Sequence, residues 1–115
     1  MDTPLAYSAH MRFVETPVFT RALKRLIDDE AYRRLQIALM LRPEQGAVIR
    51  GSGGLRKLRW STLDTGKRGG LRVIYYWAAE ESVFYMLFVY CKTEQGDLTA
   101  AQVKILGRLV REEFK

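Results

Sequence analysis

Two long runs of β-branched and aromatic residues, separated by only four residues, constrain the fold of this chain more than any other feature. The runs are Leu71–Ala78 and Val83–Cys91, and the segment Ala79–Ser82 lies between them. Val, Ile, Tyr, Phe and Trp favour strands, and so short a connection favours an antiparallel hairpin. The pattern therefore predicts two neighbouring strands that form a hairpin.

Two helices are expected on the N-terminal side of this hairpin. Thr16 followed by Pro17 is typical of a helix start, with Thr as the N-cap and Pro in the first turn. Asp28 offers a second N-cap, and the helix that follows it must end before Pro43. The short connection between the two predicts a helical hairpin.

Further strands and a last helix complete the predicted fold. Arg12–Glu15 and Leu55–Trp60 are expected strands, and Thr99 and Gln102 have the spacing of a capping box for a C-terminal helix. The order is then β-α-α-β-β-β-α. It predicts the α+β class, with an antiparallel sheet that carries an N-terminal helical hairpin and a C-terminal helix.

Size and composition bound the type of protein. The chain has 115 residues, of which 48% are hydrophobic, so we expect one domain over residues 11–115 after a loose extension over residues 1–10. No apolar run is long enough to cross a bilayer, and the start of the chain lacks the pattern of a secretory signal. Cys91 is the single cysteine and no Cys/His cluster suits a metal, so we expect a cytoplasmic protein without metal or cofactor.

Positive charge is concentrated in one segment. The net charge is +6, and Asp64 is the only acidic residue between positions 50 and 72. Seven basic residues lie in that segment, so it carries an excess equal to the whole net charge: Arg50, Arg56, Lys57, Arg59, Lys67, Arg68 and Arg72. Such a segment is typical of a surface that binds a polyanion, and nucleic acid is the first candidate. A run of charge by itself is more often a solvated loop.

The residue types favour cationic chemistry. His10 is the only histidine, which excludes a two-histidine ribonuclease and disfavours Ser–His–Asp or Cys–His catalysis. Lys57 and Arg59 share one face of their expected strand, Arg72 begins the next strand and Lys92 follows the last, so the four can converge. Such cations bind RNA phosphates and stabilise the charge that develops when a 2′-hydroxyl attacks phosphorus. Binding without catalysis is an equally open interpretation.

Three segments in this order, Gly53–Arg59, Gly66–Tyr76 and Phe84–Glu94, resemble the RelE/HigB family of toxins from bacterial type II toxin–antitoxin systems. The resemblance runs from Met11 to the C-terminus and is closest to the HigB branch. It implies a compact RelE-like fold and an mRNA interferase that cleaves mRNA in the ribosomal A site by metal-free 2′-hydroxyl attack. The implied partners are the ribosome with its mRNA and a cognate antitoxin, of the helix-turn-helix HigA type, through which operator DNA is bound.

The same resemblance assigns roles by position. Lys57 matches a basic residue proposed for proton transfer or charge stabilisation, Arg72 matches the arginine that contacts the reacting phosphate, and Lys92 lies where the family has basic residues. These three are the expected catalytic residues. The expected RNA- and ribosome-binding residues are Arg56, Arg59, Lys67 and Arg68.

Departures from the family pattern leave alternatives open. Thr93 and Thr99 stand where some members have an arginine and a tyrosine, so the general base stays undecided between Lys57 and Lys92. The related ParE toxins share the fold but inhibit DNA gyrase, and a plain nucleic-acid-binding module is a third interpretation. The full set of cations favours RNA over gyrase.

Overall fold

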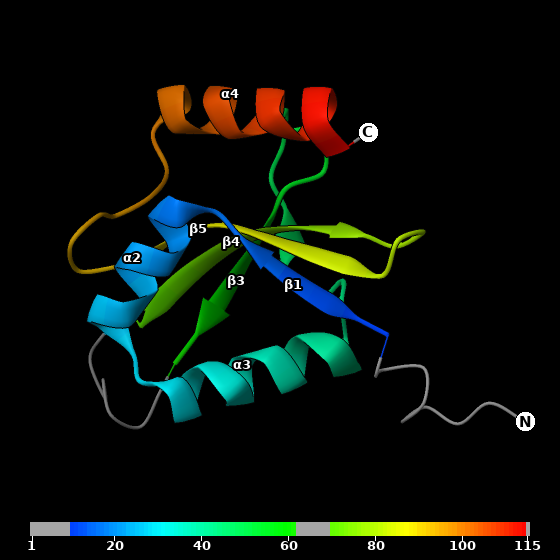
Figure 1. Cartoon of the computed structure of the whole chain (residues 1–115). Coiled ribbons are helices and arrows are strands. Elements are labelled where there is room, and N and C mark those ends of the chain that lie inside the picture. The colour runs from blue at the N-terminus through cyan, green and yellow to red at the C-terminus, as the bar shows by residue number, and fades with distance from the viewer. Residues whose placement is uncertain (1–9, 62–69, 115) are drawn as a thin grey trace, which may run out of the picture.

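The fold is a five-stranded sheet with helices on both faces, seen in a computed structural model that describes residues 10–61 and 70–114 (Figure 1). The strands, in chain order, are β1 (Arg12–Glu15), β2 (Ala47–Val48), β3 (Arg56–Trp60), β4 (Leu71–Ala78) and β5 (Val83–Cys91). Their order across the sheet is β1-β5-β4-β3-β2. The expected α+β class is confirmed. The expected extension over residues 1–10 lies outside the described residues except for His10, which is exposed.

The predicted hairpin forms the centre of the sheet. β4 and β5 have the predicted limits and pair antiparallel from Ala78 opposite Val83 to Leu71 opposite Cys91. A register shift at Ile74/Tyr75 marks a bulge, which increases the local twist of such a pair.

The edges of the sheet differ from the sequence prediction. β1 pairs parallel with β5, so the sheet is mixed rather than wholly antiparallel. Alternation of apolar residues is the same for either direction of the neighbouring strand, and the path through the two N-terminal helices decides the direction here. β2 was not expected, since two residues are too few to show any alternation.

Local capping determines where the helices begin. In α2 (Pro17–Leu26) the Thr16 hydroxyl accepts a hydrogen bond from the Phe19 amide at 3.0 Å. In α3 (Asp29–Leu41) the Asp28 carboxylate accepts one from the Ala31 amide at 2.8 Å. Both caps are as predicted. The two helices run in different directions from their short connection (Figure 1), and the rings of Phe19 on α2 and Tyr32 on α3 lie 6.1 Å apart between them.

The last helix covers the opposite face of the sheet. α4 (Ala100–Leu109) begins with the predicted capping box of Thr99 and Gln102 and continues into a π-helical turn, η1 (Val110–Phe114). The ring of Phe114 stacks on Tyr85, with centroids 3.8 Å apart, and this contact holds the end of the chain against the sheet. No helix within the described ranges is long and apolar enough to cross a membrane.

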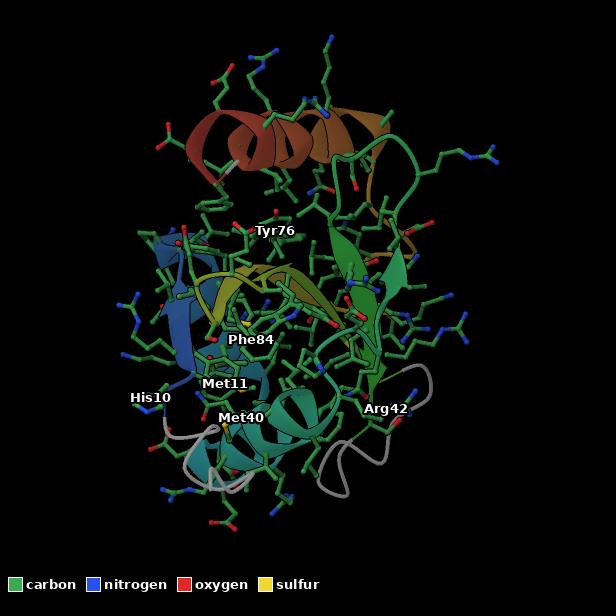
Figure 2. The ribbon with its side chains drawn as sticks, turned by 90° about the vertical axis from the view of Figure 1, so that its right-hand side faces the viewer. His10, Met11, Met40, Arg42, Tyr76 and Phe84 are labelled. Atoms are coloured by element: carbon green, nitrogen blue, oxygen red, sulfur yellow. The ribbon has the colours of Figure 1, made fainter. Side chains whose placement is uncertain are left out.

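Each face of the sheet has its own core because residues alternate along the central strands. Val73 and Tyr75 belong to the core beneath α2 and α3, together with Phe19, Leu35 and Phe84. Ile74 belongs to the core beneath α4, together with Leu55, Leu87 and Val110. Figure 2 shows this division, with Tyr76 between the sheet and α4 and Phe84 on the other side. Arg72 lies two residues before Ile74 on the same strand and therefore projects from the α4 face.

Candidate nucleic-acid interface

A row of polar side chains crosses the α4 face of the sheet at one end. Arg59 on β3 is the Cα partner of Arg72 on β4, and Arg72 is the partner of Tyr90 on β5. Directly opposite residues of antiparallel strands project from the same face. Lys57 lies two residues before Arg59 and shares that face. The predicted convergence of Lys57, Arg59 and Arg72 is therefore what the strand register produces.

Arg72 stands in the middle of the row and is largely covered. It is only 7% exposed, and its Nη1 donates a hydrogen bond to the Leu71 carbonyl oxygen at 3.3 Å. Arg59 beside it is exposed. A guanidinium covered to this extent depends on its partners to compensate for the lost hydration.

Lys57 and Tyr90 meet at one carboxylate. Oδ1 of Asp97 accepts hydrogen bonds from Lys57 Nζ at 3.1 Å and from Tyr90 Oη at 3.4 Å. The Leu98 amide donates to the same oxygen at 2.8 Å. Asp97 lies between β5 and α4, so the segment that leads into the last helix connects the two strands on either side of β4.

These contacts change the acidity of two groups. The hydrogen bond from Lys57 is the main reason why the pKa of Asp97 lies below its usual value, and the Leu98 amide adds to the effect. Burial raises the pKa of Tyr90, and the nearby Asp97 charge raises it further while Arg72 opposes the rise. At neutral pH Asp97 is therefore a carboxylate and Tyr90 a neutral hydroxyl donor.

Lys92 lies at the same end of the sheet. It directly follows β5, and its backbone amide donates to the Gly70 carbonyl oxygen at 3.0 Å, just before β4 begins. Its side chain is exposed. The structure thus brings Lys92 to the end of the sheet where Arg59 and Arg72 project.

One of the sequence-predicted binding residues, Arg56, does not join this row, and two others lie outside the described residues. Arg56 projects from the opposite face of β3, where its Nη1 donates to the carbonyl oxygens of Glu44 at 2.9 Å and Gly46 at 2.8 Å. These contacts hold the chain just before β2 in place. Lys67 and Arg68 lie outside the described residues.

Sequence reasoning missed Tyr90 and Asp97 as site residues. Tyr90 reads as one more aromatic of an apolar strand, and Asp97 as a residue before a helix cap. One signal was available for Tyr90, because its position alternates in phase with Lys92 and it lies near the same strand end. Nothing in the local sequence around Asp97 indicates that it reaches Lys57, which is 40 positions away.

Other features of the described chain offer no competing site. No three His, Cys, Asp or Glu side chains within residues 10–61 and 70–114 gather so as to hold a metal ion. Cys91 is half-buried, and its Sγ lies 3.1 Å from Thr93 Oγ1. A shallow, open hollow at β1 and α2 is lined by Glu15, Pro17, Thr20, Arg21 and Lys24.

Comparison with known proteins identifies the fold. No family model matches the sequence. A chain of the intact E. coli RelBE toxin–antitoxin complex is similar with a TM-score of 0.52 and 16% identity, over 69% of this chain and 93% of that one. A mutant of E. coli toxin RelE in the free state is similar with a TM-score of 0.51 and 18% identity, over 76% and 88% of the two chains. The mixed sheet, with α2 and α3 on one face and α4 on the other, is therefore a RelE-like fold.

Proposed function

We propose that this protein is the toxin of a bacterial type II toxin–antitoxin system and that it cleaves mRNA in the A site of the ribosome. The observation that carries the proposal is the row of Arg59, Arg72 and Tyr90 with Lys57 beside it, on one face of a RelE-like fold. Cations held by neighbouring strands bind phosphate and stabilise negative charge that develops during reaction.

The cations take distinct roles in this proposal. Arg72, on the strand between β3 and β5, contacts the phosphate under attack, and exposed Arg59 binds a neighbouring phosphate of the RNA. Lys57 is paired with Asp97 as an ammonium group, which suits it to stabilise charge or to protonate the leaving oxygen. Lys92 is exposed at the same end and is the remaining candidate for the base.

The reaction needs only these groups and the RNA. A base removes the proton of the 2′-hydroxyl, and the 2′-oxygen forms a bond to the adjacent phosphorus. The bond from phosphorus to the 5′-oxygen breaks, and that oxygen takes up a proton. The products are a 2′,3′-cyclic phosphate and a free 5′-hydroxyl. The additional negative charge on the phosphoryl oxygens in the transition state is what Arg72 stabilises most.

A cognate antitoxin is the first of the proposed partners. One similar structure contains RelE together with its antitoxin, which supports a cognate antitoxin for this chain. We expect it to be of the helix-turn-helix HigA type and to provide the contact with operator DNA. Membership of the HigB branch and action on the programmed ribosome are parts of the proposal. Arg56, Lys67 and Arg68 stay candidates for contacts with ribosomal RNA.

The test is RNA cleavage by the purified chain, freed of antitoxin, on one mRNA with and without programmed ribosomes. Defined cuts that require ribosomes and disappear in Arg72→Ala support the proposal, provided that Arg34→Ala cuts normally. Arg34 is an exposed arginine on α3 that pairs with Glu30, away from the proposed site. Growth arrest without cleavage would indicate a gyrase inhibitor of the ParE type. RNA binding without either effect would indicate a simple binding module.

A further inference from the structure

Asp97 places an anionic oxygen on the α4 face of the sheet, beside the cations that would receive a phosphate. One carboxylate oxygen accepts from the Lys57 ammonium at 3.1 Å, the Tyr90 hydroxyl at 3.4 Å and the Leu98 amide at 2.8 Å. The three donors come from β3, from β5 and from the segment just before α4, and Arg72 on β4 lies between the two strands. A lysine, a hydroxyl and a backbone amide are also the donors that proteins use for phosphate oxygens.

We infer that the Lys57 ammonium, the Tyr90 hydroxyl and the Leu98 amide form a subsite for an RNA phosphate. In the absence of RNA the Asp97 carboxylate occupies this subsite, and RNA enters it by displacing the carboxylate. The nature of the ligand, an RNA phosphodiester, rests on the proposed function. The geometry of the subsite rests on the hydrogen bonds to Asp97.

The exposure of the partners permits displacement. The side chain of Asp97 is 69% exposed and that of Lys57 is 31% exposed, so water and ions reach the pair. Ion pairs of this kind are weak because solvent screens them. Tyr90 is only 4% exposed and is held within β5, so its hydroxyl keeps its place when the carboxylate leaves.

The rest of the connecting segment is held by other contacts. Glu94 pairs with Arg25 on α2 at 3.2 Å, and the side-chain Nε2 of Gln95 donates to Gln102 Oε1 at 2.7 Å. The Asp97 side chain can therefore rotate away while the backbone of the segment, and with it the Leu98 amide, stays in position.

The first test compares two variants that each remove one negative charge from this segment, Asp97→Asn and Glu94→Gln. The probe is a short 2′-O-methyl RNA, which cannot be cleaved. We expect Asp97→Asn to bind it about threefold to tenfold more tightly at low salt, and Glu94→Gln to bind it about as tightly as the unmodified chain. Equal tightening in both variants would show that only net charge matters and would overturn the inference. Weaker binding by a folded Asp97→Asn protein would overturn it too.

A second pair of variants tests the donors. In a Lys57→Met background the gain from Asp97→Asn should be much smaller, since the carboxylate then has no ammonium to release and covers only the Tyr90 hydroxyl and the Leu98 amide. An undiminished gain there would place the effect elsewhere and contradict the inference. Tyr90→Phe, which keeps the buried ring, should weaken RNA binding about threefold through the lost hydroxyl. Unchanged binding by Tyr90→Phe would remove Tyr90 from the subsite.

A titration with inorganic phosphate separates this inference from the proposed function. Displacement of Asp97 should move the Leu98 amide resonance in the unmodified chain, and the shift should be much smaller in Lys57→Met. If phosphate acts in this way but no mRNA is cut, the nuclease function fails while the subsite stands. If mRNA is cut but Asp97→Asn behaves like Glu94→Gln, the subsite fails and the nuclease function stands.

Discussion

Arg59 on β3 and Arg72 on β4 stand directly opposite each other in an antiparallel register, so two guanidinium side chains share one face of the sheet. Like charges in directly opposed positions destabilise a strand pair, by about 0.2–1 kcal/mol. A ligand with two or more negative charges would relieve repulsion of this kind. The pair therefore connects the stability of the sheet to the occupancy of the proposed RNA site.

Replacing the exposed member of this pair should stabilise the empty protein. Arg59→Thr removes the repulsion and introduces a residue that favours strands, so we expect the free energy of unfolding to rise by about 0.5 kcal/mol. RNA should bind less tightly and with a weaker dependence on salt, because one phosphate contact is lost. Urea unfolding and RNA titrations at several salt concentrations measure the two effects.

Arg12→Thr is the matched control for this change. Arg12 is an exposed arginine on an edge strand and lies opposite Val83 rather than opposite another arginine. It should show neither the gain in stability nor the change in salt dependence. A loss of stability in Arg59→Thr would mean that the two arginines do not repel each other in the folded chain.

Arg72→Ala should remove the activity and preserve the fold. A donor that stabilises charge developing in a transition state is worth about 10²–10³ in rate, so we expect at least that loss in mRNA cleavage and an end to growth arrest. Binding of the antitoxin should not change. Cleavage rates on programmed ribosomes, together with circular dichroism and co-purification with the antitoxin, measure these outcomes. Full toxicity of a folded Arg72→Ala protein would refute the role of Arg72.

Much of the fold could be predicted because its signals are local. The caps at Thr16, Asp28 and Thr99 depend on neighbouring residues only, and the structure confirms all three. The limits of β4 and β5 follow from continuous apolar runs that both faces of the sheet bury. The parallel pairing of β1 with β5 could not be predicted, because it joins residues 71 positions apart, as between Arg12 and Val83, and alternation carries no sign of direction.

The candidate site could also be predicted from the sequence only in part. Strand alternation was sufficient to place Lys57 and Arg59 on one face, and the same alternation puts Arg56, which lies next to Lys57, on the other. The contact between Lys57 and Asp97 depends on how a connecting segment folds back over the sheet. Such a contact is a product of tertiary structure, and no spacing within the sequence indicates it.

The Asp97 carboxylate should make the stability of the fold depend on acid pH. Its pKa lies below the usual 3.8, chiefly because Lys57 donates a hydrogen bond to the ionised form. A carboxyl whose pKa is lowered by folding stabilises the folded state above its unfolded pKa, and this contribution disappears as the pH falls through the folded value. We therefore expect Asp97→Asn to be slightly less stable at neutral pH and equal to the unmodified chain in strong acid.

Thermal unfolding of both proteins at a series of pH values tests this expectation. The difference in Tm should be constant from neutral pH down to about 4.5 and should decline below that point. The difference is expected to be small because Asp97 is well exposed to solvent. A difference that grows as the pH falls would show the opposite sign of linkage and would argue against the Lys57 contact.

The Tyr75 hydroxyl should be important for stability alone. It accepts from the Gly46 amide at 3.0 Å and donates to the Pro43 carbonyl oxygen at 2.8 Å, and Tyr75 itself is fully buried. Tyr75→Phe leaves a buried amide without its partner, so we expect a loss of about 1–3 kcal/mol in the free energy of unfolding. Tyr85→Phe is the control, since its hydroxyl donates to Glu81 at an exposed position, and it should change stability by less than about 0.5 kcal/mol.

Cys91 should contribute to packing and not to catalysis. It ends β5, is half-buried against the core beneath α2 and α3, and has Thr93 Oγ1 at 3.1 Å from its sulfur. In Cys91→Ser the hydroxyl keeps Thr93 as a hydrogen-bond partner but replaces apolar contacts, so we expect a loss of about 1 kcal/mol in unfolding free energy. Cys91→Ala should lose a similar amount, through the contacts of the missing sulfur.

Both Cys91 variants should cut mRNA on programmed ribosomes at the unmodified rate at a temperature where they are folded. If Cys91→Ser is folded and inactive while Cys91→Ala is active, the new hydroxyl disturbs neighbouring Lys92, whereas inactivity of both would make the thiol part of the reaction.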